Sequence, residues 1–198
     1  MKQNIGLNWF LTHSQNTYGI HFGKEIETMI ENIKIRPLVP SDRERVCAFF
    51  RALGEEGGRF FNLNDYNERH TYAFLDGERQ NHIYWAAVAD TPAGEEIVGL
   101  VFLYKINTGI PWLGVGVAEK WQGRHLGRRL VRTAEQWAEA AGAGGILLTT
   151  ARDNIRAQML YKHMGYKNIG HYCNGELLYL LTFPSKTQTD KSDFPAEL

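Results

Sequence analysis

Hydrophobic and polar positions follow regular patterns along this chain from residue 33 onward. Ile33–Leu38 alternates between the two kinds of residue, which indicates a strand. Ser41 and Glu44 follow at the spacing of a capping box, in which two side chains satisfy the first backbone groups of a helix. The apolar positions after them repeat at helical spacing and predict a helix that ends near Gly54; they are Val46, Phe49, Phe50 and Leu53.

The next segments predict a loop, a second helix and two long strands. Gly54–Arg59 is rich in glycine and predicts the loop, whereas Asp65–Leu75 predicts the helix. His82–Asp90 and Ile97–Asn107 are rich in β-branched and aromatic residues, which is typical of strands. The turn-like Thr91–Gly94 joins them, so the two strands are expected to pair.

The second half of the chain alternates between strands and helices. Trp112–Val117 and Ile146–Thr150 predict strands, and Asn154–Met164 predicts a helix that ends at Gly165. A longer helix between these strands stops at Gly142, and its apolar face comprises Leu126, Leu130, Ala134, Trp137 and Ala141.

The chain then predicts a hairpin. Tyr166–Cys173 and Glu176–Phe183 flank Asn174-Gly175, a dipeptide that favours the tight turn between two antiparallel strands. The complete order is β-α-α-β-β-β-α-β-α-β-β, which predicts an α/β (α+β) fold with a mixed sheet and helices on its faces.

Neither an internal repeat nor a linker divides residues 33–183, so they are expected to form one domain. Residues 1–32 carry aromatic residues without clear periodicity and form an N-terminal extension of unknown role. This extension packs loosely on the domain, contacts a second copy in a homodimer, or covers the substrate as a lid. Residues 184–198 are polar and are expected to be disordered.

Composition limits the classes of partner. Lys+Arg and Asp+Glu both number 22, so the formal net charge is zero and gives no long-range attraction to nucleic acid or to an anionic membrane. Neither a membrane-spanning apolar run nor a signal peptide is present, which favours a cytoplasmic protein. Cys47 and Cys173 are expected to be reduced, buried thiols, and the histidine spacing gives no reason to expect a metal site.

Val115–Arg128 is the segment that carries candidate chemistry. A buried strand runs into a loop with Gly123 and Gly127, and a long helix leaves it. The first N–H groups of a helix have no partner inside the helix and lie at the positive end of its dipole, so they can bind a phosphate. Four arginines add local positive charge: Arg124, Arg128, Arg129 and Arg132. On spacing alone, a plain strand–turn–helix connection with a solvated basic face explains the segment equally well.

A resemblance separates these alternatives. Gln122–Gly127 resembles the acyl-CoA-binding motif of the GNAT acetyltransferase superfamily, Gln/Arg-x-x-Gly-x-Gly/Ala, with His125 in place of the central glycine. A second signature of the superfamily follows at the expected distance and consists of Asn154, Ala157, Leu160, Tyr161, Gly165 and Tyr166. Ile35–Pro37 and Ser41-Asp42 also resemble the first strand and helix start of its members, so the resemblance covers residues 33–183.

The resemblance implies a mixed, mostly antiparallel sheet of six to seven strands flanked by about four helices. It implies acetyl-CoA, or another short acyl-CoA, as co-substrate. Val115 and Val117 would lie beside the pantetheine arm, Asn154 would hydrogen-bond it, and the pyrophosphate would lie against Gln122, Gly123, Arg124, His125, Leu126, Gly127 and Arg128.

The resemblance also implies that Tyr161 protonates the leaving thiolate. A phenol has a reference pKa of about 10 and a thiol one of about 8.5, so a phenol can hold the proton until the thiolate forms. The alternative is a core tyrosine on an amphipathic helix. The implied activity is N-acetyl transfer to a primary amine by direct attack in a ternary complex, and the alternative from another class is a non-catalytic acyl-CoA sensor.

Two departures from the family pattern bear on the chemistry. At His125 either the phosphate loop relaxes, the imidazole contacts phosphate, or the side chain turns into solvent. Where members often carry a carboxylate base, this chain has Trp112 or Leu113, and Thr149. Glu119 is expected to point away, and the residues that remain as candidates on the acceptor side are Glu55, Glu56, Asp65 and His70. A site without a base suits an amine of low pKa, because lysine costs about 4–5 kcal/mol to deprotonate at pH 7 and an α-amine about 1 kcal/mol.

Overall fold

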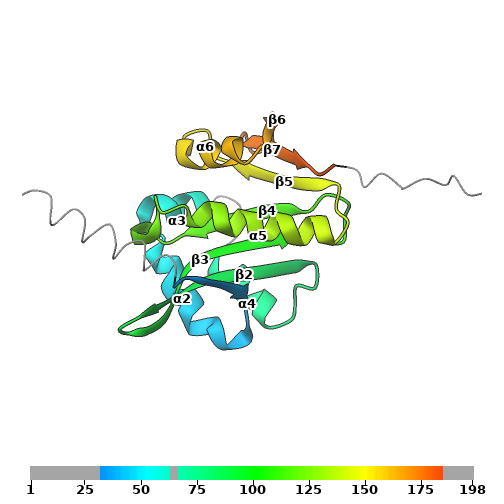
Figure 1. Ribbon diagram of the computed structural model, residues 1–198. Coiled ribbons are helices and arrows are strands. Elements are labelled where there is room, and N and C mark those ends of the chain that lie inside the picture. The colour runs from blue at the N-terminus through cyan, green and yellow to red at the C-terminus, as the bar shows by residue number, and fades with distance from the viewer. Residues whose placement is uncertain (1–31, 63–66, 185–198) are drawn as a thin grey trace, which may run out of the picture.

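A computed structural model describes residues 32–62 and 67–184 and shows a seven-stranded mixed sheet with helices on both faces (Figure 1). The order of strands across the sheet is β1-β2-β3-β4-β5-β7-β6. This confirms the predicted fold class. The strands are β1 (Lys34–Pro37), β2 (His82–Thr91), β3 (Gly94–Tyr104), β4 (Trp112–Val117), β5 (Gly145–Thr150), β6 (Lys167–His171) and β7 (Leu177–Thr182).

Five α-helices occur among the described residues, one more than expected, and two short 3-10 turns accompany them. The extra helix is α3, because the glycine-rich segment predicted as a loop is helical. The helices are α2 (Arg43–Ala52), α3 (Gly54–Asn62), α4 (Glu68–Leu75), α5 (Leu126–Ala140) and α6 (Ile155–His163), and the 3-10 turns are η1 (Pro40–Asp42) and η2 (Glu119–Trp121).

The sheet separates between β4 and β5. All other neighbouring strands pair antiparallel, whereas β4 and β5 are parallel and meet at the single pair Trp112–Leu147. Beyond that pair the two strands run without a ladder between them, although each pairs along its length with its outer neighbour. Figure 1 shows the consequence: β5, β7 and β6 with α6 form one part of the molecule, and β1–β4 with the other helices form the second.

Close packing at glycines shows which helix covers which face. A Cβ atom added to Gly99 of β3 would lie 2.7 Å from Leu130 of α5. A Cβ atom added to Gly116 of β4 would lie 2.7 Å from the Phe61 ring of α3, and Gly99 and Gly116 face opposite sides of the sheet because Gly99 pairs with Val117. Therefore α5 covers one face and α3 covers the other.

Several predicted boundaries are confirmed by conformation. The long helix α5 stops before Gly142, and α6 stops before Gly165, both of which have a positive φ. The predicted hairpin forms around Asn174-Gly175, where the Gly175 N–H donates to the Tyr172 carbonyl oxygen over 2.8 Å. The tight turn at Pro92-Ala93 joins β2 and β3 as expected.

Two other predictions are wrong. The predicted capping box of Ser41 and Glu44 does not form, because α2 begins only at Arg43, after the turn η1. Instead the Val39 N–H donates to the buried Asp42 carboxylate over 3.1 Å. Arg36 pairs with the same carboxylate, so Asp42 serves the strand–helix connection. Of the two cysteines expected to be buried thiols, Cys47 is half-buried and Cys173 is exposed, because Cys173 lies in the hairpin turn.

The possible lid or dimer contact at residues 1–31, the tail from residue 185, and the predicted helix start at residues 65–66 all lie outside the described residues. Among the residues that are described, no helix is both long and apolar enough to cross a membrane.

Candidate active site

A cavity of about 640 Å³ opens where β4 and β5 separate. Its wall comes from both parts of the molecule: α3, β3, β4 and the loop after it on one side, and β5, α6 and Glu176, which precedes β7, on the other. Because the strands lack a ladder here, the cavity reaches residues on both faces of the sheet, including Phe61 on the α3 face and Leu126 on the α5 face.

Glycines on β4 bring aromatic rings close to the strand. The ring of Phe61 packs directly on Gly116, and the ring of Phe102 from β3 packs on Gly114. The two rings are 6.1 Å apart in an edge-to-face arrangement, which is favourable for aromatic pairs. This wall of the cavity is thus apolar and rigid.

The loop of residues 122–128, called the phosphate loop after its predicted role, contributes every residue but Arg124 to the cavity wall. Gly123 and His125 both adopt left-handed backbone conformations, with φ of 75° and 59°. α5 starts directly after His125, and no side chain caps its N-terminus. The first N–H groups of α5 are therefore donors at the positive end of a 15-residue helix, beside the side chain of Arg128.

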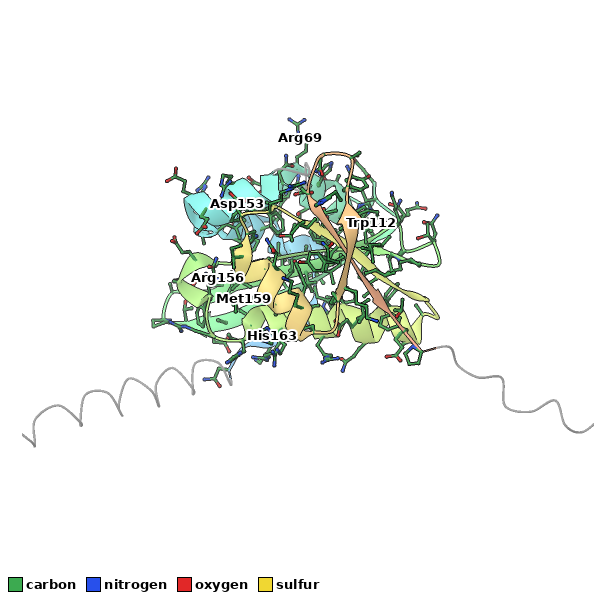
Figure 2. All side chains as sticks on the ribbon, turned by 90° about the horizontal axis from the view of Figure 1, so that it is seen from above. Arg69, Trp112, Asp153, Arg156, Met159 and His163 are labelled. Atoms are coloured by element: carbon green, nitrogen blue, oxygen red, sulfur yellow. The ribbon has the colours of Figure 1, made fainter. Side chains whose placement is uncertain are left out.

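Gln122 braces this loop. Its Nε2 atom donates to the Val117 carbonyl oxygen at the end of β4 over 3.1 Å, and its Oε1 atom accepts a hydrogen bond from Arg156 of α6. One amide in the cavity wall therefore connects β4, the loop and α6. In Figure 2, Arg156 lies on the outer side of α6 together with Met159 and His163.

This arrangement agrees with a sequence comparison. A family profile described as "Acetyltransferase (GNAT) family" matches residues 42–166, which is more than half of the chain. The chain belongs to the GNAT acetyltransferase family.

Individual GNAT relatives are distant. The mycothiol acetyltransferase of Renibacterium salmoninarum is 25% identical over 107 residues, which span 54% of this chain and 27% of that protein. The chain thus matches about a quarter of the length of this relative. Among solved structures, the PaiA N-acetyltransferase of Thermoplasma acidophilum in complex with coenzyme A superposes with a TM-score of 0.63 at 17% identity, covering 76% of this chain and 99% of the other. Arabidopsis thaliana NAA60 in complex with acetyl-CoA gives a TM-score of 0.58 at 21% identity, with 76% and 98% covered. These structures show the fold.

Tyr161 of α6, the predicted acid of this GNAT chain, lines the cavity and is 6% exposed. Its ring packs against Tyr179 of β7 at 6.1 Å and against Tyr166 at 5.7 Å. Burial raises the pKa of the Tyr161 phenol above its ordinary value, because a phenolate would lose its solvation. The phenol is therefore held in its protonated form.

Asn154 lies at the start of α6 and also lines the cavity. Its side-chain oxygen accepts a hydrogen bond from the Ala157 N–H over 3.1 Å, which caps the helix. Capping fixes the orientation of the amide, so its Nδ2 donor has a defined direction.

All but one of the residues predicted to bind the cofactor lie in the cavity wall. The exception is Arg124, whose guanidinium lies over the Trp121 ring at 5.3 Å. Two other arginines of the basic face also serve structure: Arg129 donates to the Ile33 carbonyl oxygen over 2.9 Å, and Arg132 pairs with Glu135 at 3.2 Å. The predicted residues in the wall are Val115, Val117, Gln122, Gly123, His125, Leu126, Gly127, Arg128, Asn154 and Tyr161.

Only some of the predicted base candidates line the cavity. Glu56 lines the cavity, whereas Glu55, His70 and Glu119 do not, and Asp65 lies outside the described residues. Two of the positions at which the family pattern led us to expect a carboxylate, Leu113 and Thr149, also line the cavity. No group of His, Cys, Asp or Glu among the described residues could hold a metal ion.

Sequence reasoning missed the part of the wall that β3 and the hairpin supply. Phe102, Tyr104 and Glu176 line the cavity. Outside its wall the ring of Trp112 bridges the two halves of the sheet, packing on Tyr104 at 5.9 Å and on Tyr172 of the hairpin at 5.3 Å. Figure 2 shows Trp112 beside the crossing strands of the hairpin. The Asn174-Gly175 turn predicts a hairpin, but nothing in its sequence indicates that the hairpin reaches a cavity.

Proposed function

We propose that residues 33–183 form an N-acetyltransferase domain that moves an acetyl group from acetyl-CoA to a primary amine by direct attack in a ternary complex. The observation that carries this proposal is the position of Tyr161. Its buried phenol lines the same cavity as the phosphate loop, at the point where β4 and β5 separate.

The cofactor half of the cavity suits an acyl-CoA. The uncapped N–H groups of α5, with Arg128 beside them, offer donors and positive charge to a pyrophosphate. The unpaired edge of β4 at Val115 can pair with the amide groups of a pantetheine arm, and the Nδ2 atom of Asn154 can donate to it. Solved relatives in complex with coenzyme A and with acetyl-CoA support this assignment.

In the proposed reaction Tyr161 donates the proton that the leaving sulfur needs. The amine nitrogen forms a bond to the thioester carbonyl carbon, and the carbon–sulfur bond breaks. The sulfur takes the phenolic proton as the carbon–sulfur bond breaks. The attacking nitrogen loses one proton to solvent, and Tyr161 takes up a proton from solvent.

The test is a screen for thiol release from acetyl-CoA with four classes of acceptor: simple amines, peptides with a free α-amine, aminoglycosides and polyamines. We expect at least one class to give turnover and an acetylated product by mass spectrometry. Micromolar binding of CoA without turnover on any class would instead favour an acyl-CoA sensor.

A further inference from the structure

Glu176 is a buried carboxylate in the wall of the cavity, with only 7% of its surface exposed. The other two carboxylates that line the cavity differ: Glu56 is exposed on the first turn of α3, and Asp153 is exposed and pairs with Arg59 at 2.9 Å. Among the carboxylates of the wall, Glu176 is therefore the one that the fold withholds from solvent.

The register of the sheet places Glu176 and Tyr161 on opposite faces. Tyr161 packs on Tyr179 of β7, which pairs with Leu148 on the α5 and α6 face. Leu178 pairs with Thr149, which shares a face with Leu147 and hence with its partner Trp112. Side chains alternate along a strand, so Glu176 lies on the face of Leu178, which is the face that α3 covers.

Contacts around the hairpin fix the position of this carboxylate. Asn174 Nδ2 donates to Glu176 Oε2 over 2.9 Å, and the Glu176 N–H donates to Asn174 Oδ1 over 3.1 Å. Arg152 Nε donates to the Gly175 carbonyl oxygen over 3.1 Å, which ties the turn to the loop after β5. The carboxylate is thus held by its own turn at the edge of the cavity.

We propose that Glu176 accepts the proton of the acceptor ammonium, so that the amine attacks from the α3 face while the thiolate leaves toward Tyr161. This inference rests on the proposed function. The ammonium proton passes to a Glu176 oxygen and then to solvent, and the freed electron pair of nitrogen forms the bond to the carbonyl carbon. The carbon–sulfur bond breaks, and sulfur takes the Tyr161 proton. A second proton then leaves the nitrogen and restores Tyr161 through solvent. For each turnover one proton is released to solvent.

The assignment supplies the base that is missing from the usual strand positions. Deprotonation of a lysine-like amine costs about 4–5 kcal/mol at pH 7, and a positioned base contributes about 10²–10⁴-fold to the rate. A carboxylate in the cavity wall also attracts a cationic acceptor. The acceptor is therefore an amine that is protonated at neutral pH.

The test compares Glu176→Gln with the wild-type protein, using an acceptor found by the thiol-release screen. We expect kcat/KM at pH 7 to fall about 100-fold, with unchanged CoA affinity. The deficit should shrink as the pH approaches the pKa of the amine, because the unprotonated amine then needs no base. Glu176→Asp should recover part of the activity. A purely structural role would lower the rate equally at every pH.

Two further variants and the wild-type profile complete the design. Glu55→Gln is the matched control, since Glu55 is exposed and outside the cavity wall, and Glu56→Gln tests the competing carboxylate. If Glu176→Gln does not fold, the wild-type pH–rate profile still decides: an acidic limb well below the pKa of the amine is expected, and a limb at the pKa of the amine itself overturns the inference. The other titratable groups in the wall are Glu56, Tyr104, His125, Arg128, Asp153, Arg156 and Tyr161.

The outcomes separate the inference from the proposed function. Wild-type turnover together with an active Glu176→Gln variant, or with a large loss only in Glu56→Gln, overturns the role of Glu176 and leaves the acetyltransferase intact. Absence of wild-type turnover on every amine overturns both.

Discussion

Tyr161 on α6 and Glu176 just before β7 line one cavity from opposite faces of the sheet. This relationship exists because β4 and β5 pair only at Trp112–Leu147 and then separate. A thioester held in the gap would expose its carbonyl carbon to an amine on one face and its sulfur to a proton donor on the other. The separation of the two strands is thus the structural basis of the proposed transfer.

Arg128 provides a test of the phosphate site. We expect Arg128→Ala to weaken binding of CoA about 10–100-fold, because a hydrogen bond to a charged group contributes about 1.5–3 kcal/mol. Acetyl-pantetheine lacks the pyrophosphate, so its KM should not change. Isothermal titration calorimetry measures the first effect and steady-state kinetics the second. Arg132→Ala on the same helix is the control, since Arg132 pairs with Glu135 outside the cavity wall. Equal losses for both ligands would contradict the assignment.

His125 has the left-handed conformation that a glycine adopts without strain, with φ of 59° and ψ of 6°. A side chain in this conformation is strained. We expect His125→Gly to raise the free energy of unfolding by about 1 kcal/mol while CoA affinity is retained, whereas His125→Ala keeps the strain and gains nothing. Urea denaturation and calorimetry measure the two quantities. A tenfold loss of CoA affinity in the glycine variant would show that the imidazole contacts phosphate.

Helix α3 packs on Gly116 of β4 through the ring of Phe61. A Cβ atom there would lie 2.7 Å from the ring of Phe61 and 3.3 Å from Leu53, so Gly116→Ala must displace both. We expect a loss of about 1–3 kcal/mol in stability and a raised KM for the amine, because Phe61 lines the cavity. Gly58→Ala is the matched change on α3, where an added Cβ meets no atom within 4 Å. If both variants have the same melting temperature and KM, the packing described at Gly116 is wrong.

His82 makes the stability of the fold depend on pH. Burial lowers its pKa from 6.5 to about 4, and the nearby charges of Arg79 and His70 act in the same direction. The unfolded chain therefore binds this proton more readily than the folded chain, and stability is lost as the pH falls from about 6.5 towards 4. We expect protonation of His82 to lower the free energy of unfolding by about 2 kcal/mol between pH 7 and pH 5. Chemical denaturation of His82→Phe should show a smaller loss over that range, and identical curves would contradict the assignment.

The sequence predicts the fold well where a local signal is unambiguous. Gly142 and Gly165 end helices, and Asn174-Gly175 forms the hairpin, because each turn has its own conformational demand. Gly54–Arg59 reads as a loop because glycine is a poor helix former, but packing of Phe61 and Leu53 on Gly116 stabilises a helix there. Tertiary contacts of this kind leave no local pattern.

Some residues of the candidate site can also be predicted from the sequence, and others cannot. The phosphate loop, Asn154 and Tyr161 follow contiguous motifs and therefore can be recognised in the chain. Glu176 enters the cavity only because β7 pairs with β5, and this pairing brings together residues from separate elements. Arg124 stands within the motif but packs on Trp121, so a motif position alone does not establish a contact with the cavity.

The most direct test of acetyl transfer at this site is the kcat of Tyr161→Phe, measured by thiol release together with the Kd for CoA. We predict a fall in kcat of about 10²–10⁴-fold with a Kd within threefold of the wild-type value, because the variant removes only the proton donor. Tyr179→Phe, whose ring packs on Tyr161 outside the cavity wall, should remain near wild-type activity. A Tyr161→Phe variant with wild-type kcat would contradict the account.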